Sequence, residues 1–454
     1  MCIWSKSNIV KILGLDALDN SWRWHNGSMQ IYGSLPFRTH GDYHMTEDDI
    51  RPRGPVIKAK CGELLPKLLP RLLGTDAGEH VGCIEFIDCN LCSGEFLSVF
   101  ASNVQLRSLS LNNNSIVMGD PSELMRHVCQ FEGLHDLSIS LQVGMEGLKE
   151  LLLTDLDELQ ALQTLSFSNC FLIDVDVLQD LPNLLELNLR RVWLLNEGGV
   201  WLISPSLQTL RIDELTFAHH TIGADLPALK QLMFSSFDLA DAPMGDESQL
   251  RRMIMELATL PLQAIESEDS SKSVYARKFP SFRFTCNYGR LREAGHERLM
   301  SILQVILESP LAEVFCSLKA VSLNFDASQL GPGSMRLIYN LFSGAEQISS
   351  VLGCTDVEAF TAAISCNTQL RTLRFYDEGS PSMHATIVPA LLAALRLGKS
   401  FELCLYVGRI TYGYKSKGQQ QLDCILKEWE GLKRKAVGAG SDVRLSIKRG
   451  YPDL

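Results

Sequence analysis

The chain has 454 residues, of which 42 are Lys or Arg and 53 are Asp or Glu, so its formal net charge is −11. With 46% hydrophobic and 21% charged residues, the composition is that of an ordinary folded protein and excludes intrinsically disordered and collagen-like classes. No stretch approaches the roughly 18 uninterrupted apolar residues that a membrane-spanning helix needs, so we do not expect a membrane protein.

The N-terminal residues lack a long apolar run, and Asp16 and Asp19 come too early for an organelle presequence. The 13 cysteines form no short regular framework, which suits a reducing compartment better than a secreted protein. We therefore expect a cytoplasmic protein, with the nucleus as the alternative.

Residues 1–80 are interpreted as an N-terminal cap. Asn26-Gly27 separates two alternating segments, residues 21–25 and 28–32, and this is the strongest short signal for a β-hairpin. A polar loop is expected over residues 40–55, followed by a Leu-rich segment over 63–73. Such a cap would cover the open edge of the first repeat.

A repeated pattern begins at residue 81. Leu106, Leu109, Leu111, Asn114 and Ile116 spell L-x-x-L-x-L-x-x-N-x-I, in which the leucines hold positions one, four and six and the asparagine holds position nine. Repeats start at 81, 106, 134, 162, 184, 207 and 229. These spacings fall within the roughly 20 to 29 residues expected of such a repeat. Further matches are Leu257-Leu260-Leu262, Phe279-Phe282-Phe284, Leu318-Val321-Leu323, Ile348-Val351, Leu370-Leu373-Phe375 and Leu403-Leu405.

Several segments between the repeats carry helix signals. Residues 120–123 resemble a capping box with proline at the first helical position, and helices are also predicted from Thr355 and over 299–307. The shorter repeats between 162 and 250 leave room only for a turn or a 3₁₀ segment. A helical stripe over 422–432 and a last strand over 443–447 are predicted to close the array.

These motifs resemble the leucine-rich repeat family, and the 28-residue units resemble its ribonuclease-inhibitor-like class. The resemblance implies an α/β solenoid, a horseshoe with a parallel concave β-sheet and a mixed helix and turn convex side, over residues 81–454 including a C-terminal cap. The 39-residue unit that starts at Phe279 departs from the regular pattern. We expect the repeats to stack as one cooperative unit.

Motifs for chemistry are missing or incomplete. The segment from His296 begins like a zinc-protease helix, but Met300 stands where the second histidine would be required. Cys89-x-x-Cys92 has the spacing of a metal or redox pair, yet Cys89 and Cys170 both hold position nine, where a buried, reduced thiol is expected. No nucleophile elbow, phosphate loop or dinucleotide motif is found. We therefore predict no enzymatic activity, no cofactor and no metal.

The resemblance implies that the concave sheet contacts a protein. Positions three, five and seven project from that sheet by strand alternation; they are short and polar in the early repeats and longer from Leu184 onward. The predicted partner-binding residues are Glu186, Asn188, Arg190, Arg211, Asp213, Met233, Arg283, Arg374 and Tyr376. In the alternative interpretation, Arg190 and Asp213 merely pair with each other across adjacent strands.

The predicted function is thus a non-enzymatic scaffold that binds a partner protein. The alternative is a substrate receptor of an F-box ubiquitin ligase, because residues 61–70 have a Leu-Pro texture similar to an F-box, although two prolines interrupt the expected helix. The basic run at 433–435 is interpreted as a solvated helix end, and no nucleic-acid partner is expected.

Overall fold

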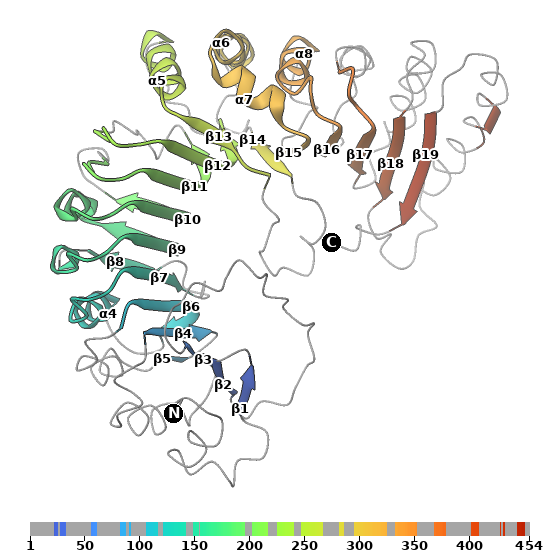
Figure 1. Cartoon of the computed structure of the whole chain (residues 1–454). Helices are drawn as coiled ribbons and strands as arrows, with labels where there is room; N and C mark the ends of the chain where they lie inside the picture. Colours follow the sequence, from blue (N-terminus) through green and yellow to red (C-terminus); the bar gives the residue numbers. More distant parts are fainter. Residues whose placement is uncertain are drawn as a thin grey trace. The chain divides into compact units, whose positions relative to one another are not determined.

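The structure is a computed structural model of the whole chain (Figure 1). The residues that it describes are 22–25, 28–32, 56–60, 82–87, 90–91, 106–116, 121–141, 149–153, 155–195, 202–216, 225–239, 247–266, 281–285, 295–324, 332–351, 367–377, 401–407, 427, 430–431 and 443–449. The chain forms two compact units. Unit 1 comprises Met1–Arg211 and Thr221–Lys230, and unit 2 comprises Ile212–His220 and Gln231–Leu454.

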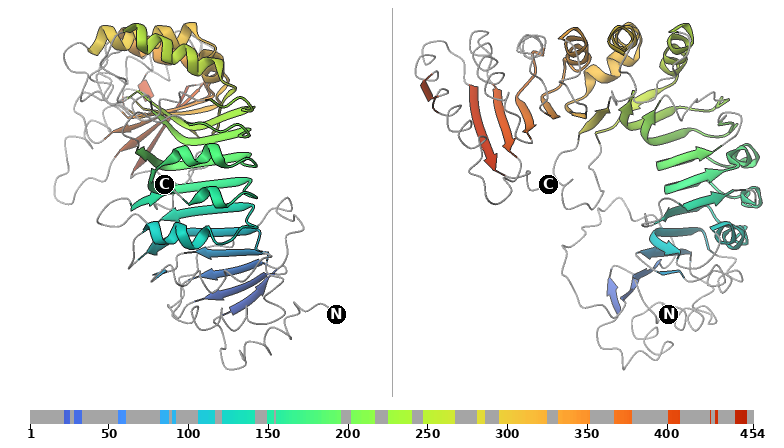
Figure 2. Two further views of the ribbon diagram at one scale, coloured as in Figure 1. Left: turned by 90° about the vertical axis from the view of Figure 1, so that its left-hand side faces the viewer. Right: turned by 180° about the vertical axis from the view of Figure 1, so that it is seen from behind.

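Unit 1 is a stack of strands with short helices and turns on one side (Figure 2). Its strands are β1 (Trp22–His25), β2 (Ser28–Tyr32), β3 (Val56–Lys60), β4 (Cys83–Ile87), β5 (Asn90–Leu91), β6 (Ser108–Ile116), β7 (Asp136–Leu141), β8 (Lys149–Leu152), β9 (Thr164–Ile173), β10 (Glu186–Leu195) and the start of β11 (Thr209–Thr216). Its helical elements are α4 (Pro121–Val128) and the 3₁₀ turns η4 (Leu156–Glu158) and η5 (Val175–Asp180).

The pairing of these strands confirms the predicted hairpin and the predicted repeats. β1 and β2 are antiparallel, with His25 opposite Ser28. From β2 onward the strands β3, β4, β6, β7, β9 and β10 pair in parallel, each with the next. The strand β3 belongs to this parallel array but carries no repeat signature, and the sequence did not reveal it.

The register of unit 1 follows the leucine positions. Leu109, Leu137, Leu165 and Leu187 lie opposite one another on successive strands, and each is at most 1% exposed. At position two, the carbonyl of one repeat accepts two N–H groups from the next repeat, as Arg107 does from His135 and Asp136 at 2.8 and 2.9 Å. Because the described repeats of unit 1 share this register and these backbone hydrogen bonds, unit 1 is a leucine-rich repeat solenoid of the α/β class.

Unit 2 continues the parallel pattern with longer helices on one side of its strands (Figure 1). Its strands are β12 (Gln231–Asp238), β13 (Leu262–Ala264), β14 (Phe282–Thr285), β15 (Ala320–Asn324), β16 (Gln347–Val351), β17 (Thr372–Asp377), β18 (Phe401–Val407) and β19 (Val443–Arg449). Its helices are α5 (Glu247–Thr259), α6 (Gly295–Glu308), α7 (Leu311–Ser317) and α8 (Pro332–Leu341).

Strands β14 to β19 pair in parallel in sequence order. Leu323 of β15 lies opposite Phe284 at position six, and Leu405 lies opposite Phe375, as the repeat alignment predicts. The 39-residue unit that starts at Phe279 is long because it contains two helices, α6 and α7. The predicted helices at residues 120–128 and 299–307 are confirmed by α4 and α6.

Two sequence alignments in unit 2 were wrong in register. Leu257 does not open a strand; it lies in α5, and Leu262 lies opposite Leu232 at position four rather than at position six. Likewise Ile348 holds position four, opposite Leu373, so that the first position is taken by the fully buried Ala345. In the first case, leucines at helical spacing concealed the true alignment. In the second case, a small residue at a core position concealed it.

The register of unit 2 steps by three residues at β12. The first half of β12 pairs with β13, and its second half pairs with β14, where Phe237 lies opposite Phe284. Phe237 holds position nine of its repeat, whereas Phe284 holds position six. Because β14 is offset along β12, it does not pair with the first half of β12, and β13 pairs with that half instead.

A cluster of phenylalanines fills the core at this step. Phe315 of α7 has ring contacts with five others, at centroid distances from 5.2 to 6.3 Å. These partners come from β12, β14 and the residue that follows α8, and they are Phe234, Phe237, Phe282, Phe284 and Phe342. All six side chains are less than 2% exposed, so α7 is anchored to several strands at once.

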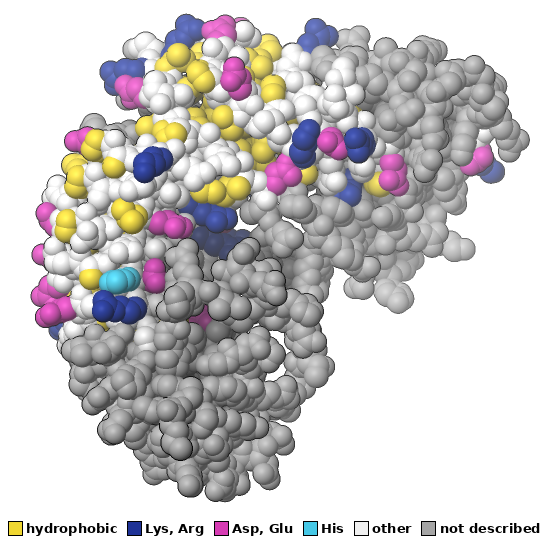
Figure 3. Space-filling view, in the orientation of Figure 1, with side chains coloured by type: hydrophobic (Ala, Val, Ile, Leu, Met, Phe, Trp, Pro, Cys, Tyr) yellow, Lys and Arg dark blue, Asp and Glu magenta, His cyan; other side chains and the backbone are white. Residues whose placement is uncertain are grey.

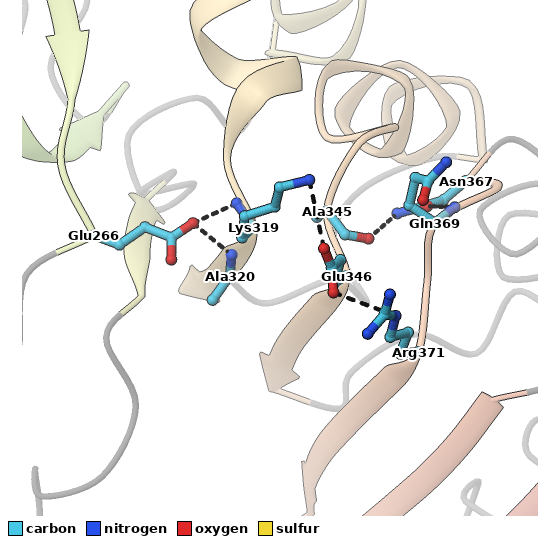
Figure 4. A network of polar contacts seen from close by, with 8 residues as sticks. All are labelled: Glu266, Lys319, Ala320, Ala345, Glu346, Asn367, Gln369 and Arg371. Carbon is cyan, nitrogen blue, oxygen red and sulfur yellow. Dashed lines mark hydrogen bonds and ion pairs between the residues drawn. The ribbon is translucent and has the colours of Figure 1, made fainter.

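Next to this register step, a side-chain carboxylate accepts the hydrogen bonds that a backbone carbonyl accepts in the regular repeats (Figure 4). The Oε1 atom of Glu266 accepts hydrogen bonds from the backbone N–H groups of Lys319 and Ala320, the latter at 2.6 Å. These residues hold positions two and three, whose N–H groups are bound in the regular repeats by a backbone carbonyl of the preceding repeat. One repeat later the regular arrangement returns, since the carbonyl of Lys319 accepts from Glu346.

Side chains add a second layer to this junction (Figure 4). Glu346 forms ion pairs with Lys319 at 3.4 Å and with Arg371 at 3.3 Å, and so links three successive repeats. All three side chains are partly or largely exposed to solvent, so these pairs contribute little stability. The amide of the buried Asn367 instead donates to the carbonyl of Ala345 at 2.8 Å and thereby satisfies buried backbone.

Several predictions fall on residues that the structure does not describe. They concern Cys89, the segments 40–55, 61–70 and 433–435, the helix from Thr355 and most of the stripe over 422–432. No single helix in the described ranges is long and apolar enough to cross a membrane; α6 and α7 meet that test only together, across a bend of 87°.

Cys170 is completely buried at position nine, as predicted, and burial raises the pKa of its thiol to about 12. The thiol is therefore neutral at pH 7, and we expect it to resist alkylation in the native protein, because alkylation requires the thiolate. Cys170→Ser should lower the free energy of unfolding by about 1–3 kcal/mol, since a hydroxyl is costlier to bury. Urea unfolding measures the loss.

Cys316→Ser provides the matched control. Cys316 is only half-buried, and its Sγ already donates to the carbonyl of Leu341 at 3.3 Å, a bond that a serine hydroxyl also makes. We expect a smaller loss than for Cys170→Ser. Rapid alkylation of native Cys170, or equal losses in the two variants, would contradict the prediction.

Candidate partner-binding surface

The predicted alternation of the concave face is confirmed where it is described. In β7, Leu137, Ile139 and Leu141 are buried, whereas the residues between them are half-buried. The half-buried set at positions three, five and seven is Asp136, Ser138 and Ser140. These side chains are short, so the early repeats present a shallow polar surface.

On β10 the side chains become longer and form a local network. Glu186, Asn188 and Arg190 are all half-buried. The amide of Asn188 donates to Glu186 Oε1 and to Ser166 Oγ, both at 3.0 Å. Its carbonyl oxygen is buried and has no hydrogen-bond partner within the protein.

Strand β11 carries two of the predicted partner-binding residues, and the boundary between unit 1 and unit 2 falls between them. Arg211 is exposed and is the last residue of the first part of unit 1. Asp213 belongs to unit 2, where its Oδ1 accepts from the Ser235 hydroxyl at 2.6 Å. Since Arg190 and Asp213 lie in different units, their predicted pairing stays a prediction.

In unit 2 the register places Arg283 and Arg374 in one column. Arg283 lies opposite Ser322, Ser322 opposite Ser349, and Ser349 opposite Arg374. At about 4.8 Å per strand, three steps put the two arginine backbones about 14 Å apart. Arg283 is exposed and Arg374 is half-buried, so two cationic side chains flank two strands of short hydroxyl side chains.

The remaining predicted residues lie elsewhere in the same sheet. Met233 is half-buried and lies opposite Gln263 of β13. Tyr376 lies in β17 opposite Tyr406 of β18, and its side chain is outside the described set. Ser349 also lies on this surface, opposite Arg374, and it was not predicted because its strand had been aligned in the wrong register.

No group of three or more His, Cys, Asp or Glu side chains among the described residues is arranged to hold a metal ion. The two thiols whose pKa is raised, those of Cys129 and Cys170, are buried and lie at core positions rather than on the concave columns. For Cys129, burial is the main cause, and nearby Asp155 contributes. The described surface is therefore a set of hydrogen-bonding and cationic groups suited to recognition.

Comparison with known proteins finds a similarity among solved structures alone. No family model and no curated protein matches it. Among solved structures, it is similar to a chain described as "Crystal structure of TLR13-ssRNA13 complex", at 16% sequence identity and a TM-score of 0.34. The similarity covers 73% of this chain and 44% of that chain, so this chain matches less than half of that protein's length. The assignment as a leucine-rich repeat solenoid rests on the register and hydrogen bonds described above.

Proposed function

We propose that this protein is a non-enzymatic scaffold of the cytoplasm that binds a partner protein through the concave face of its repeats. The observation that carries the proposal is the change from short to long polar side chains along that face. β7 presents an aspartate and two serines, whereas β10 presents Glu186, Asn188 and Arg190 and β11 presents the exposed Arg211.

Long hydrogen-bonding side chains are typical of protein interfaces, in which arginine is enriched. The partially buried network of Glu186 and Asn188 limits the rotamers available to these side chains before binding, which lowers the entropy lost on association. The net charge of −11 disfavours a nucleic-acid partner, whose phosphates are bound mainly by Lys and Arg.

We expect the double variant Arg190→Glu and Arg211→Glu to weaken partner binding by more than about tenfold, or some 1.4 kcal/mol. Both residues lie in unit 1 and neither is buried, so the thermal midpoint should stay nearly unchanged. The measurement is affinity capture from cell lysate with the wild-type chain as bait, followed by titration of the retained partner against both chains.

The matched control reverses two exposed arginines that are not on the concave face, Arg126 of α4 and Arg252 of α5. It makes the same change in net charge and should leave binding intact. Unchanged affinity in the Arg190 and Arg211 variant would move the interface elsewhere. Capture of a ubiquitin-ligase adaptor as a stoichiometric partner would favour the F-box alternative.

A further inference from the structure

The strands of unit 1 extend beyond the concave face and form a second surface. Asn169 in β9 and Arg191 in β10 both have left-handed backbones, with φ of 58° and 50°, and each marks a corner in its strand. Beyond the corner the strands stay paired, with Val192 opposite Cys170, and β8 joins them on the other side, with Lys149 opposite Cys170. This part of the sheet forms a flank of unit 1.

Alternation divides the flank into an inner and an outer side. Cys170, Leu172 and Val192 are buried in the core. The residues between them face outward, and they include two aromatic side chains, Phe171 and Trp193, which lie opposite each other in the register. Their rings are 5.6 Å apart between centroids, so the two side chains form one continuous surface.

Aliphatic side chains extend this surface. Two residues after Phe171 in β9, Ile173 lies opposite Leu152 of β8, and both side chains are half-buried. Trp193 is 36% exposed and is the one exposed aromatic residue among those whose side-chain burial the structure describes. We call Leu152, Phe171, Ile173 and Trp193 the aromatic flank. A contiguous apolar surface that includes an exposed tryptophan is characteristic of an interaction site rather than of ordinary solvent-facing sheet.

The border of the aromatic flank is acidic. Between Leu151 and Leu189 the chain has seven Asp or Glu residues and no Lys or Arg, and the nearest basic residues are Lys149 in β8 and, in β10, Arg190 and the exposed Arg191 at the corner. Most of them lie in the turns that directly follow β8 and β9, and the exposed ones there are Asp157, Glu158, Asp174, Asp176 and Asp180. Figure 3 shows magenta side chains along the edge of unit 1 where η4 and η5 lie in Figure 1.

We propose that the aromatic flank docks a basic amphipathic segment of a partner protein, in which aromatic or aliphatic anchors contact Trp193 and Phe171 and Lys or Arg residues face the acidic turns. Charge complementarity selects this occupant. A second copy of the chain would bring the same acidic turns together, at a cost from like-charge repulsion, and nucleic-acid phosphates would meet the same repulsion. The site is separate from the concave face and does not depend on that face's function.

The experiment uses the purified full-length chain and a phage-displayed library of random peptides. Selection on the wild-type chain, after depletion on Trp193→Ala, should enrich peptides with alternating apolar anchors and an excess of Lys and Arg. In titrations of a labelled enriched peptide, Trp193→Ala should bind at least about tenfold more weakly than wild type. The double variant Asp174→Asn and Asp176→Asn should bind at least about threefold more weakly and show less dependence on salt.

Leu185→Ala is the matched control, because Leu185 is also an exposed apolar side chain of unit 1, at 39%, but lies at position two, outside the aromatic flank. It should bind the peptide like wild type, and circular dichroism should show that all three variants keep the native fold. The proposal is overturned if no peptide is enriched, if enriched peptides are neutral or acidic, or if Trp193→Ala binds as well as Leu185→Ala. Self-association that is lost in Trp193→Ala would also overturn it, by assigning the flank to a second copy.

Discussion

Phe315→Ala should lower the free energy of unfolding by about 3–5 kcal/mol, the range for truncating a buried phenylalanine. The loss falls at the high end of ordinary core substitutions because Phe315 contacts five other rings and is fully buried. Removing it leaves a cavity that borders β12, β14 and Phe342, and rigid strands on several sides prevent the core from collapsing into it. Urea denaturation followed by circular dichroism gives the change.

Phe131→Ala is the companion variant in unit 1, where Phe131 is 3% exposed. If the repeats unfold as one cooperative unit, as we expect, each variant shifts a single transition. Two transitions that respond separately to the two variants would contradict that cooperativity. A loss below about 1 kcal/mol for Phe315→Ala would show that the cluster is not a main source of stability.

Gly344→Ala should cost about 2–3 kcal/mol, at the upper end of the range for overpacking a core. A Cβ at Gly344 would lie 2.0 Å from the carbonyl oxygen of Cys316 and 3.2 Å from its carbonyl carbon. These are backbone atoms at the end of α7, so no rotamer change relieves the clash, and α7 would have to move away from the segment that leads to β16. Thermal and urea unfolding both measure the effect.

Gly431→Ala is the control, because nothing lies within 4 Å of a Cβ at that position. Gly431 is an exposed helical residue, so we expect alanine there to leave stability unchanged or to raise it by up to about 1 kcal/mol. Equal stability losses at the two glycines would show that the close approach to Cys316 is not what requires glycine at position 344.

The regular part of the fold could be predicted from the sequence because one physical requirement recurs there. Leu109, Leu137 and Leu165 must all point into the same core, so their spacing and their register in the sheet follow from the repeat pattern. The same alternation also fixes which side chains line the concave face, although it says nothing of what they bind.

The irregular part could not be predicted because its contacts link residues that are far apart in the chain. Glu266 binds the N–H group of Ala320 from 54 residues away, and no local pattern marks a carboxylate that serves as a strand neighbour. Ala345 is fully buried at the first position of its repeat, where the repeat pattern calls for leucine. Trp193 holds position ten, which the repeat pattern leaves unspecified, so sequence periodicity assigns it no role.

The register step at β12 also limits how this array can change length. A repeat array can gain or lose a whole repeat without losing stability only where all junctions between repeats are alike. An inserted repeat then makes the same contacts with its new neighbours as the original repeat makes with its own. At the step, β12 divides its partners between β13 and β14, and Phe315 joins them from outside the sheet. These segments therefore form an indivisible module, and duplication or deletion of repeats is restricted to the regular stretches on either side of it.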